Sequence, residues 1–245
     1  MELLFLGRGN SSNFGEGNTS AYFIEKNNLF LIDCGETVFS KILELNVLKD
    51  INEIHLLITH THSDHIGSLG SLQQYLYWVC GKKLNIVYDA NRDYTVNIKG
   101  VLNSFGLLPE TYNMILERDL DYKFDSFEQI RYVASSHGDV PIGSSSIIIK
   151  TKNGNILYTG DIADSRVIKY FMAISEGNID KMYIDKLENK ITEEKDRPMP
   201  ILFGRGCFWY YITKTVSRGT NMTPIINERP QTELKTSDFF YDLPQ

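Results

Sequence analysis

The segment Thr59-His60-Thr61-His62-Ser63-Asp64-His65-Ile66-Gly67 constrains what this chain can fold into more than any other part of the sequence. It places four potential metal ligands directly after the apolar run His55–Thr59. A strand that opens into a loop would aim two imidazoles at one ion, and the last two ligands would face a second ion as the chain turns into a helix. Zinc binds imidazole nitrogen and carboxylate oxygen in such sites. The segment therefore predicts a metal site whose ligands are His60, His62, Asp64 and His65.

Apolar periodicity predicts alternating strands and helices over residues 1–188. Turn residues at Glu25-Lys26-Asn27-Asn28 and the pair Asn153-Gly154 each indicate a hairpin. Strands are expected at Leu3–Leu6, Tyr22–Ile24, Leu29–Ile32, His55–Thr59, Asn85–Tyr88, Tyr132–Ser135, Ser146–Lys150, Ile156–Tyr158 and Lys181–Ile184. Helices are expected at Val38–Val47, Ser68–Val79, Val96–Phe105, Glu110–Leu116 and Arg166–Ser175.

The composition changes near residue 189. Residues 189–245 hold five of the seven prolines and none of the five histidines, and their apolar periodicity fades. We therefore expect one domain over residues 1–188, followed by an atypical C-terminal segment, residues 189–245, of poor order. Two explanations of this segment stay open, an unusual native extension and a shifted reading frame.

Charge and composition exclude several classes of protein. The net charge of −6 argues against a broadly basic nucleic-acid surface. No stretch approaches the roughly 18 apolar residues of a membrane span, and the first residues lack the features of a signal peptide. The three cysteines are too few and too scattered for a disulfide scaffold. We expect a cytoplasmic protein that does not bind a membrane.

The motif His60-x-His62-x-Asp64-His65 resembles the hallmark of the metallo-β-lactamase fold superfamily. The resemblance extends to the strand end Leu31-Ile32-Asp33-Cys34-Gly35, to Ser136-His137-Gly138 and to Leu157-Tyr158-Thr159-Gly160-Asp161. Their order and spacing match the family over residues 1–188. The resemblance implies an α/β fold, a four-layer αββα sandwich of two mixed sheets with helices outside.

The same resemblance implies two Zn²⁺ ions per chain, with Mn²⁺ as an alternative metal. Its ligand pattern assigns His60, His62 and His137 to one ion and Asp64 and His65 to the other, with Asp161 bridging both. Asp64 would also act in catalysis, by orienting the attacking water and relaying its proton.

One ligand of the family pattern is missing from this chain. The family has a further histidine after its last core strand, whereas this sequence contains no histidine after His137. The second metal site is therefore expected to bind weakly. Three later residues are candidate substitutes for this histidine: Asp185, Glu188 and Cys207.

The start of the chain indicates a branch of the superfamily. Phe5–Asn10 followed by Gly17–Ala21 is similar to ribonuclease Z-like members, which include RNA-processing nucleases and cyclic-nucleotide phosphodiesterases. Binding long RNA requires many cationic contacts to phosphates, so the acidic balance favours a small nucleotide substrate. The resemblance places Ser144 and Ser145 where phosphodiesterases bind phosphate, and it leaves a homodimer open. The alternatives are an RNA-processing nuclease and a catalytically impaired metal- or ligand-binding relative.

Overall fold

The computed structural model describes residues 1–89, 94–120, 124–135, 137, 143–162, 166–186 and 208–213. Strands in these ranges form two sheets. The first sheet has the spatial order β1 (Leu4–Gly7), β2 (Ser20–Glu25), β3 (Asn28–Ile32), β4 (Glu53–Leu57), β5 (Leu84–Tyr88) and β6 (Tyr112–Leu116). Strands β1 to β3 are antiparallel, and β3 to β6 are parallel.

The second sheet is also mixed. Its spatial order is β11 (Phe208–Thr213), β10 (Ile179–Lys186), β9 (Gly154–Tyr158), β8 (Ser144–Thr151) and β7 (Gln129–Ser135). Strands β7, β8 and β9 are antiparallel neighbours, whereas β10 runs parallel to both β9 and β11. One strand of this sheet, β11, therefore comes from the C-terminal segment.

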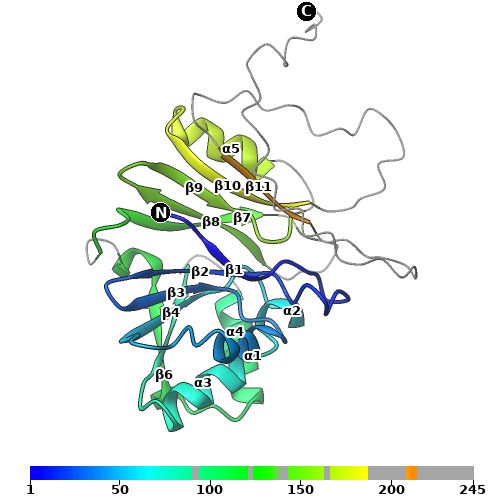
Figure 1. The fold of residues 1–245 in the computed structure, drawn as a ribbon, viewed down its shortest axis with the longest axis vertical. Helices are drawn as coiled ribbons and strands as arrows, with labels where there is room; N and C mark the ends of the chain where they lie inside the picture. Colours follow the sequence, from blue (N-terminus) through cyan, green and yellow to red (C-terminus); the bar gives the residue numbers. More distant parts are fainter. Residues whose placement is uncertain are drawn as a thin grey trace, which may run out of the picture.

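Helices lie on the outer faces of the two sheets (Figure 1). Helices α1 (Val38–Glu44), α3 (Leu69–Trp78) and α4 (Tyr94–Ser104) lie beside the first sheet, and α5 (Arg166–Ser175) lies beside the second (Figure 1). The short helix α2 (Ser63–Ile66) lies at one end of the sandwich, and two 3₁₀ turns, η1 (Pro109–Thr111) and η2 (Glu117–Leu120), flank β6.

Alternation along the strands produces the layers, because successive side chains of a strand point to opposite faces. In β3, Leu29 and Leu31 pack with the buried residues of α1 and α3, whereas Phe30 and Ile32 pack between the sheets. In β8, Ile148 packs with Phe171 of α5 on the outer face. The four-layer αββα sandwich predicted from the sequence is therefore confirmed.

The prediction for residues 110–116 was wrong. A helix was expected at Glu110–Leu116, but this stretch begins within η1 and then forms strand β6. The apolar residues alternate between the two cores, with Tyr112 and Met114 on the helix side and Ile115 on the sheet side. Pairing with β5 supplies the parallel neighbour that selects the strand, since strand preference depends on packing context.

The remaining elements lie close to their predicted positions, with ends shifted by a few residues. The expected strand His55–Thr59 starts earlier, as β4, and the expected helix Val38–Val47 ends earlier, as α1. Among the described residues, no helix is long and apolar enough to cross a membrane.

Candidate metal centre

The residues singled out by the sequence gather at one end of the sandwich because several strands end there. Asp33 follows β3, His60 follows β4, His137 follows β7 and Asp161 follows β9. Strand β8 runs antiparallel to β7 and β9, so Ser144 at its start lies at the same end. The main-chain N–H of Ser145 donates to the carbonyl oxygen of Thr59 over 2.9 Å and so joins the two sheets there.

Helix α2 is held close against the loop that follows β3. The N–H of Cys34 donates to the carbonyl oxygen of His65 over 2.7 Å, and the N–H of Ser68 donates to the carbonyl oxygen of Cys34 over 3.0 Å. A Cβ at position 35 would collide with the carbonyl oxygen of Asp64, so only glycine permits this approach. His62, just before α2, is extended, with φ −67° and ψ 155°. These backbone contacts fix the main-chain positions from which the side chains of His62, Asp64 and His65 extend.

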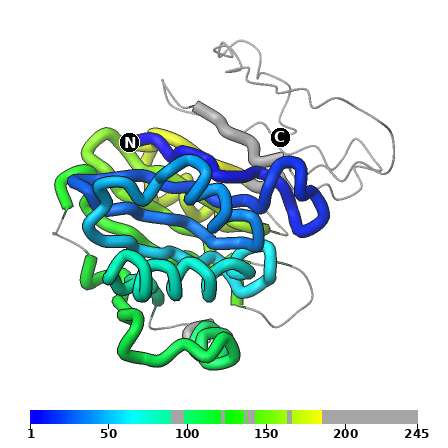
Figure 2. The backbone as a smooth tube through the Cα atoms, turned by 60° about the horizontal axis from the view of Figure 1, so that its bottom comes forward, coloured from blue at the N-terminus to red at the C-terminus, as the bar shows by residue number. Residues whose placement is uncertain are grey.

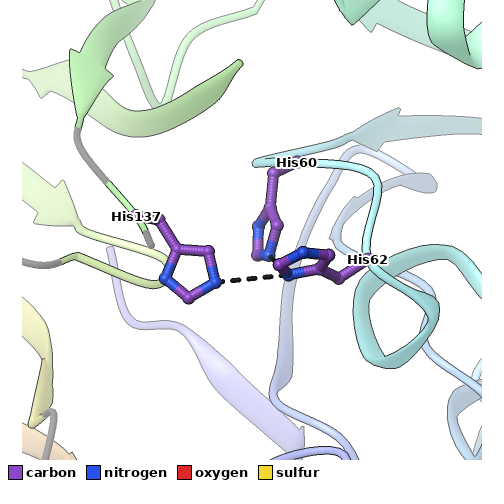
Figure 3. A group of neighbouring side chains, drawn as sticks. All are labelled: His60, His62 and His137. Carbon is purple, nitrogen blue, oxygen red and sulfur yellow. Dashed lines mark hydrogen bonds between the residues drawn. The ribbon is translucent and has the colours of Figure 1, made fainter. Parts of the chain in front are cut away.

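His60, His62 and His137 form the first group that could hold a metal ion (Figure 3). His60 Nε2 lies 3.0 Å from His62 Nδ1, which lies 3.2 Å from His137 Nε2. Figure 3 shows His137 facing the other two rings from the opposite sheet. Two nitrogens bound to one tetrahedral zinc at about 2.0–2.1 Å lie about 3.4 Å apart. The nitrogens are therefore spaced almost as one shared ion requires.

His60, His65 and Asp161 form the second such group, and all three are buried. Asp161 faces both groups, because Oδ1 lies 3.2 Å from His65 Nε2 and Oδ2 lies 3.5 Å from His137 Nε2. Asp64 belongs to neither group, but its Oδ2 is 3.7 Å from His65 Nε2. The carboxylate of Asp161 can thus reach toward both donor groups, and the carboxylate of Asp64 lies beside the second one.

Asp33 orients two of these imidazoles, a role that the sequence did not reveal. Its Oδ2 lies 2.8 Å from His65 Nδ1 and accepts a hydrogen bond of 2.8 Å from Thr59 Oγ1. Thr59 Oγ1, having donated its hydrogen, can accept from His60 Nδ1, which is 3.1 Å away. Nδ1 is then occupied in both histidines, so Nε2 is the atom left for a cation once any proton on it is released, the usual arrangement of carboxylate-supported metal ligands.

The electrostatics of the site favour a positive charge beside His65. Burial alone would lower the pKa of His65, but Asp33 and Asp161 together outweigh it and raise this pKa to about 10. Burial and the charge of His65 lower the pKa of His60, which stays neutral and keeps a free lone pair. The carboxylates thus hold a proton on His65 in the metal-free protein, at a place that suits a metal cation equally well.

The residues present fit a divalent metal. His65 Nε2 is fully buried, and it faces the carboxylates of Asp161 and Asp64 at 3.2 and 3.7 Å. Buried charges need partners of opposite sign, and a divalent cation would balance these two carboxylates. Imidazole nitrogens combined with carboxylate oxygens are the donor set that zinc prefers.

The serines predicted to bind substrate lie near the centre but are buried. Ser144 Oγ lies 3.4 Å from the carbonyl oxygen of Asp161 and 3.0 Å from Ser135 Oγ. Ser145 is fully buried, and its Oγ makes no hydrogen bond within the described ranges. Of the alternative ligands, Glu188, Cys207 and the side chain of Asp185 lie outside what the structure describes.

A comparison with protein-family profiles matches residues 1–175 to the family described as anti-Pycsar protein Apyc1. The chain belongs to this family. The matched region includes every residue of the two donor groups. No curated protein sequence matches the chain significantly.

Solved structures share the fold of this Apyc1 family member at low sequence identity. They include the metallo-beta-lactamase fold protein YhfI of Bacillus subtilis, with 19% identity over 75% of this chain and 70% of that chain and a TM-score of 0.57. Human tRNase Z, short form (ELAC1), has 16% identity over 76% and 78% of the two chains and a TM-score of 0.52. A diphosphatase from the PhnP family has 16% identity over 75% and 73% and a TM-score of 0.52. The predicted metallo-β-lactamase fold is therefore confirmed.

Proposed function

We propose that this protein is a metal-dependent hydrolase that cleaves a phosphodiester bond of small cyclic nucleotides. The observation that carries the proposal is the pair of adjoining donor groups, which share His60 and are both faced by Asp161. Membership of the Apyc1 family, a cyclic-nucleotide-degrading family, supports the choice of substrate.

In this proposal His60, His62 and His137 hold one ion, Asp64 and His65 hold the other, and Asp161 contributes to both. Zinc is the expected metal, with Mn²⁺ as the alternative. When bound, the ions supply Lewis acidity toward a phosphoryl oxygen and lower the pKa of a bound water. Asp33 and Thr59 hold His60 and His65 in the orientation that binding needs.

Asp64 is the proposed proton relay. Its carboxylate is buried in α2, and Oδ2 faces the second donor group at 3.7 Å from His65 Nε2. A carboxylate in that place can accept a proton from an attacking water at Oδ2 and release it to the leaving oxygen. Ser144 steadies the main chain of Asp161, while phosphate contact by Ser144 and Ser145 stays a prediction.

The net charge of −6 favours a substrate with few phosphates, because each phosphate of a long RNA needs a neutralising cation. A cyclic nucleotide carries a single negative charge, which two divalent ions can balance. A homodimer and a cytoplasmic location also stay predictions, and size-exclusion chromatography with light scattering would test the former.

The decisive experiment compares substrates on the zinc-loaded protein. We expect hydrolysis of 3′,5′-cyclic AMP and 3′,5′-cyclic UMP, slower cleavage of a tRNA precursor, and weaker turnover of the β-lactam nitrocefin than of bis(p-nitrophenyl) phosphate. Faster cleavage of the tRNA precursor than of either cyclic nucleotide would favour the RNA-processing alternative. Absence of all turnover despite bound metal would favour the binding relative.

Variants connect that activity to the site. His60→Ala and His62→Ala each remove one of three donors of the first group, so bound zinc should fall below about half of the wild-type content, with loss of nearly all turnover. The control is His55→Gln, because His55 is a buried histidine in β4 that stacks on Phe30, outside both donor groups. Retained metal and turnover in both alanine variants would exclude the proposed ligands.

A further inference from the structure

The loop between β1 and β2 carries an exposed aromatic ring at the metal end of the sandwich. Phe14 is 66% exposed, whereas phenylalanines such as Phe23 and Phe30 stack in the core. Figures 1 and 2 both show this dark-blue loop projecting beside α2, the helix that carries Asp64 and His65.

The base of this loop is fixed against the site. Asn18, its last residue before the buried Thr19, exchanges two hydrogen bonds with Thr37, of 2.7 and 2.9 Å. A Cβ on Gly35 would lie 2.7 Å from the Cβ of Asn18 and would also collide with the carbonyl oxygen of Asp64. Gly35 therefore lies against both Asn18 and the main chain of Asp64, so the loop starts beside the wall of the proposed active site.

The loop itself is a closed, hydrogen-bonded arm. The N–H of Arg8 donates to the main-chain carbonyl oxygen of Glu16 over 3.2 Å, and the N–H of Gly9 donates to that of Gly17 over 2.6 Å. The N–H of Gly17 donates to the carbonyl oxygen of Phe14 over 3.3 Å. This hydrogen bond closes a turn that begins at Phe14. A rigid arm of this kind presents its ring without a large entropic cost on binding.

Charge does not explain what this arm could bind. It has one cationic residue, Arg8, and one anionic residue, Glu16, so the arm carries no net charge. The remaining binding feature is the flat apolar face of Phe14. Aromatic side chains bind nucleobases by stacking, and this works for any base because every base has a π face.

We propose that Phe14 stacks on the base of the nucleotide while the phosphodiester lies at the metal centre. This inference rests on the proposed function and names the residue through which the site grips its substrate beyond the phosphate. Stacking adds binding energy without touching the reacting atoms. It should therefore lower KM and leave kcat nearly unchanged.

The test measures KM and kcat for 3′,5′-cyclic AMP and 3′,5′-cyclic UMP on zinc-loaded wild type, Phe14→Ala, Phe14→Tyr and Trp78→Ala. Loss of one stacking contact predicts a KM about 5- to 150-fold higher for Phe14→Ala with both substrates. Phe14→Tyr keeps the ring and should restore KM to about the wild-type value. Trp78 is a matched control, since it is 76% exposed but lies at the last residue of α3, about 15 Å along that helix from Ser68 beside the site.

An unchanged KM in Phe14→Ala, a fall in kcat at constant KM, or an equal rise in Trp78→Ala would each overturn the inference. Zinc content of the variants, measured in parallel, should equal that of the wild type. If the wild type cleaves neither cyclic nucleotide, the proposed function fails. Calorimetric titration with uridine 3′-monophosphate then decides the role of Phe14: weaker binding in Phe14→Ala supports stacking, and equal or absent binding by wild type and variant excludes it.

Discussion

At the scale of single residues, Asp33 shows what a sequence motif leaves open. The sequence marks Asp33 only as the end of a strand followed by Cys34 and Gly35. Its partners, Thr59 and His65, lie 26 and 32 residues further along the chain. Only the parallel pairing of β3 with β4 brings these groups together. The candidate ligands could be proposed from sequence because four of them lie within six residues, whereas their support depends on the fold.

Replacing Asp33 by Asn should weaken metal binding with little change in the backbone. Asn keeps one oxygen acceptor but loses the charge and the second acceptor that orient His65 and Thr59. Changes to groups that support metal ligands typically cost about 10- to 100-fold in affinity. Competition with a chromophoric zinc chelator would measure the zinc affinity of the variant and of the wild type.

Asp50→Asn is the matched control for this variant. Asp50 has φ 59° and Asp33 has φ 62°, so both substitutions place Asn in the left-handed backbone conformation that it tolerates. Asp50 is exposed and lies outside both donor groups, so zinc affinity should not change. Equal affinity of Asp33→Asn and wild type would show that Asp33 does not support the site.

The two described cysteines should differ in reactivity. Burial raises the pKa of the Cys34 thiol to about 12, outweighing a hydrogen bond with Ser68, and Cys34 is fully buried. Because this pKa is raised, almost no thiolate forms between pH 7 and 9, and the thiolate is the species that reacts. Iodoacetamide with peptide mapping should therefore label Cys80, which is partly exposed, well before Cys34 at both pH values. Urea should make the two alike, and rapid native labelling of Cys34 would contradict its burial.

At the scale of elements, length and context explain which predictions held. Helix α5 and the β2–β3 hairpin were recovered because each carries its own periodicity or turn signal. Strand β6 was not recovered, because Tyr112–Leu116 is short and its apolar residues fit both the helical and the strand period. Its partner, β5, decides the outcome, and that pairing joins segments more than twenty residues apart. Helix α2 was missed because its four residues are too few to show a period.

Two glycines in different elements predict opposite effects of the same substitution. Gly35→Ala forces a methyl group into the carbonyl oxygen of Asp64, so it should lower the free energy of unfolding by about 1–3 kcal/mol and displace α2. Gly100 lies in α4 with nothing within 4 Å of an added Cβ. Gly100→Ala should therefore raise stability by about 0.5–1 kcal/mol, since alanine is the better helix former.

Urea unfolding followed by far-UV circular dichroism would measure both changes, and zinc content would report on the displacement of α2. Gly35→Ala should also bind less zinc, whereas Gly100→Ala should bind as much as wild type. A Gly35→Ala protein as stable as wild type would show that the loop after β3 and α2 can separate without cost.

At the scale of the whole molecule, the sandwich explains why the site draws on distant segments. The first sheet supplies His60 and Asp33, and the second supplies His137 and Asp161, so the donor groups exist only when the two sheets are packed together. Phe30, Ile32, Ile147 and Tyr158 belong to the core between the sheets that fixes this packing. Metal binding and folding should therefore be linked, and zinc should raise the midpoint of thermal unfolding.

The resemblance predicts a further histidine after the last core strand, and β11 is the last strand among the described residues. Strand β11 runs parallel to β10, so both strands end at the same edge of the sheet. Strand β9 ends at that same edge, two residues before Gly160 and three before Asp161. The sequence continues after Thr213 with Lys214, and it has no histidine beyond His137. A lysine ammonium has no lone pair to offer a metal.

The second ion should therefore bind more weakly than the first. Asp64, His65 and Asp161 would leave water to complete its coordination, and loss of a protein ligand should cost at least the roughly 10- to 100-fold seen for lost supporting groups. Zinc titration against a competing chelator should resolve one tight and one weaker site, and added Zn²⁺ or Mn²⁺ should raise turnover reversibly. His137→Ala should abolish the tight site and leave the weaker one, whereas Asp161→Asn should weaken both, because Asp161 faces both groups. Two equally tight ions in the wild-type chain would show that another residue completes the site, and single alanine variants of Asp185, Glu188 and Cys207 would then identify it.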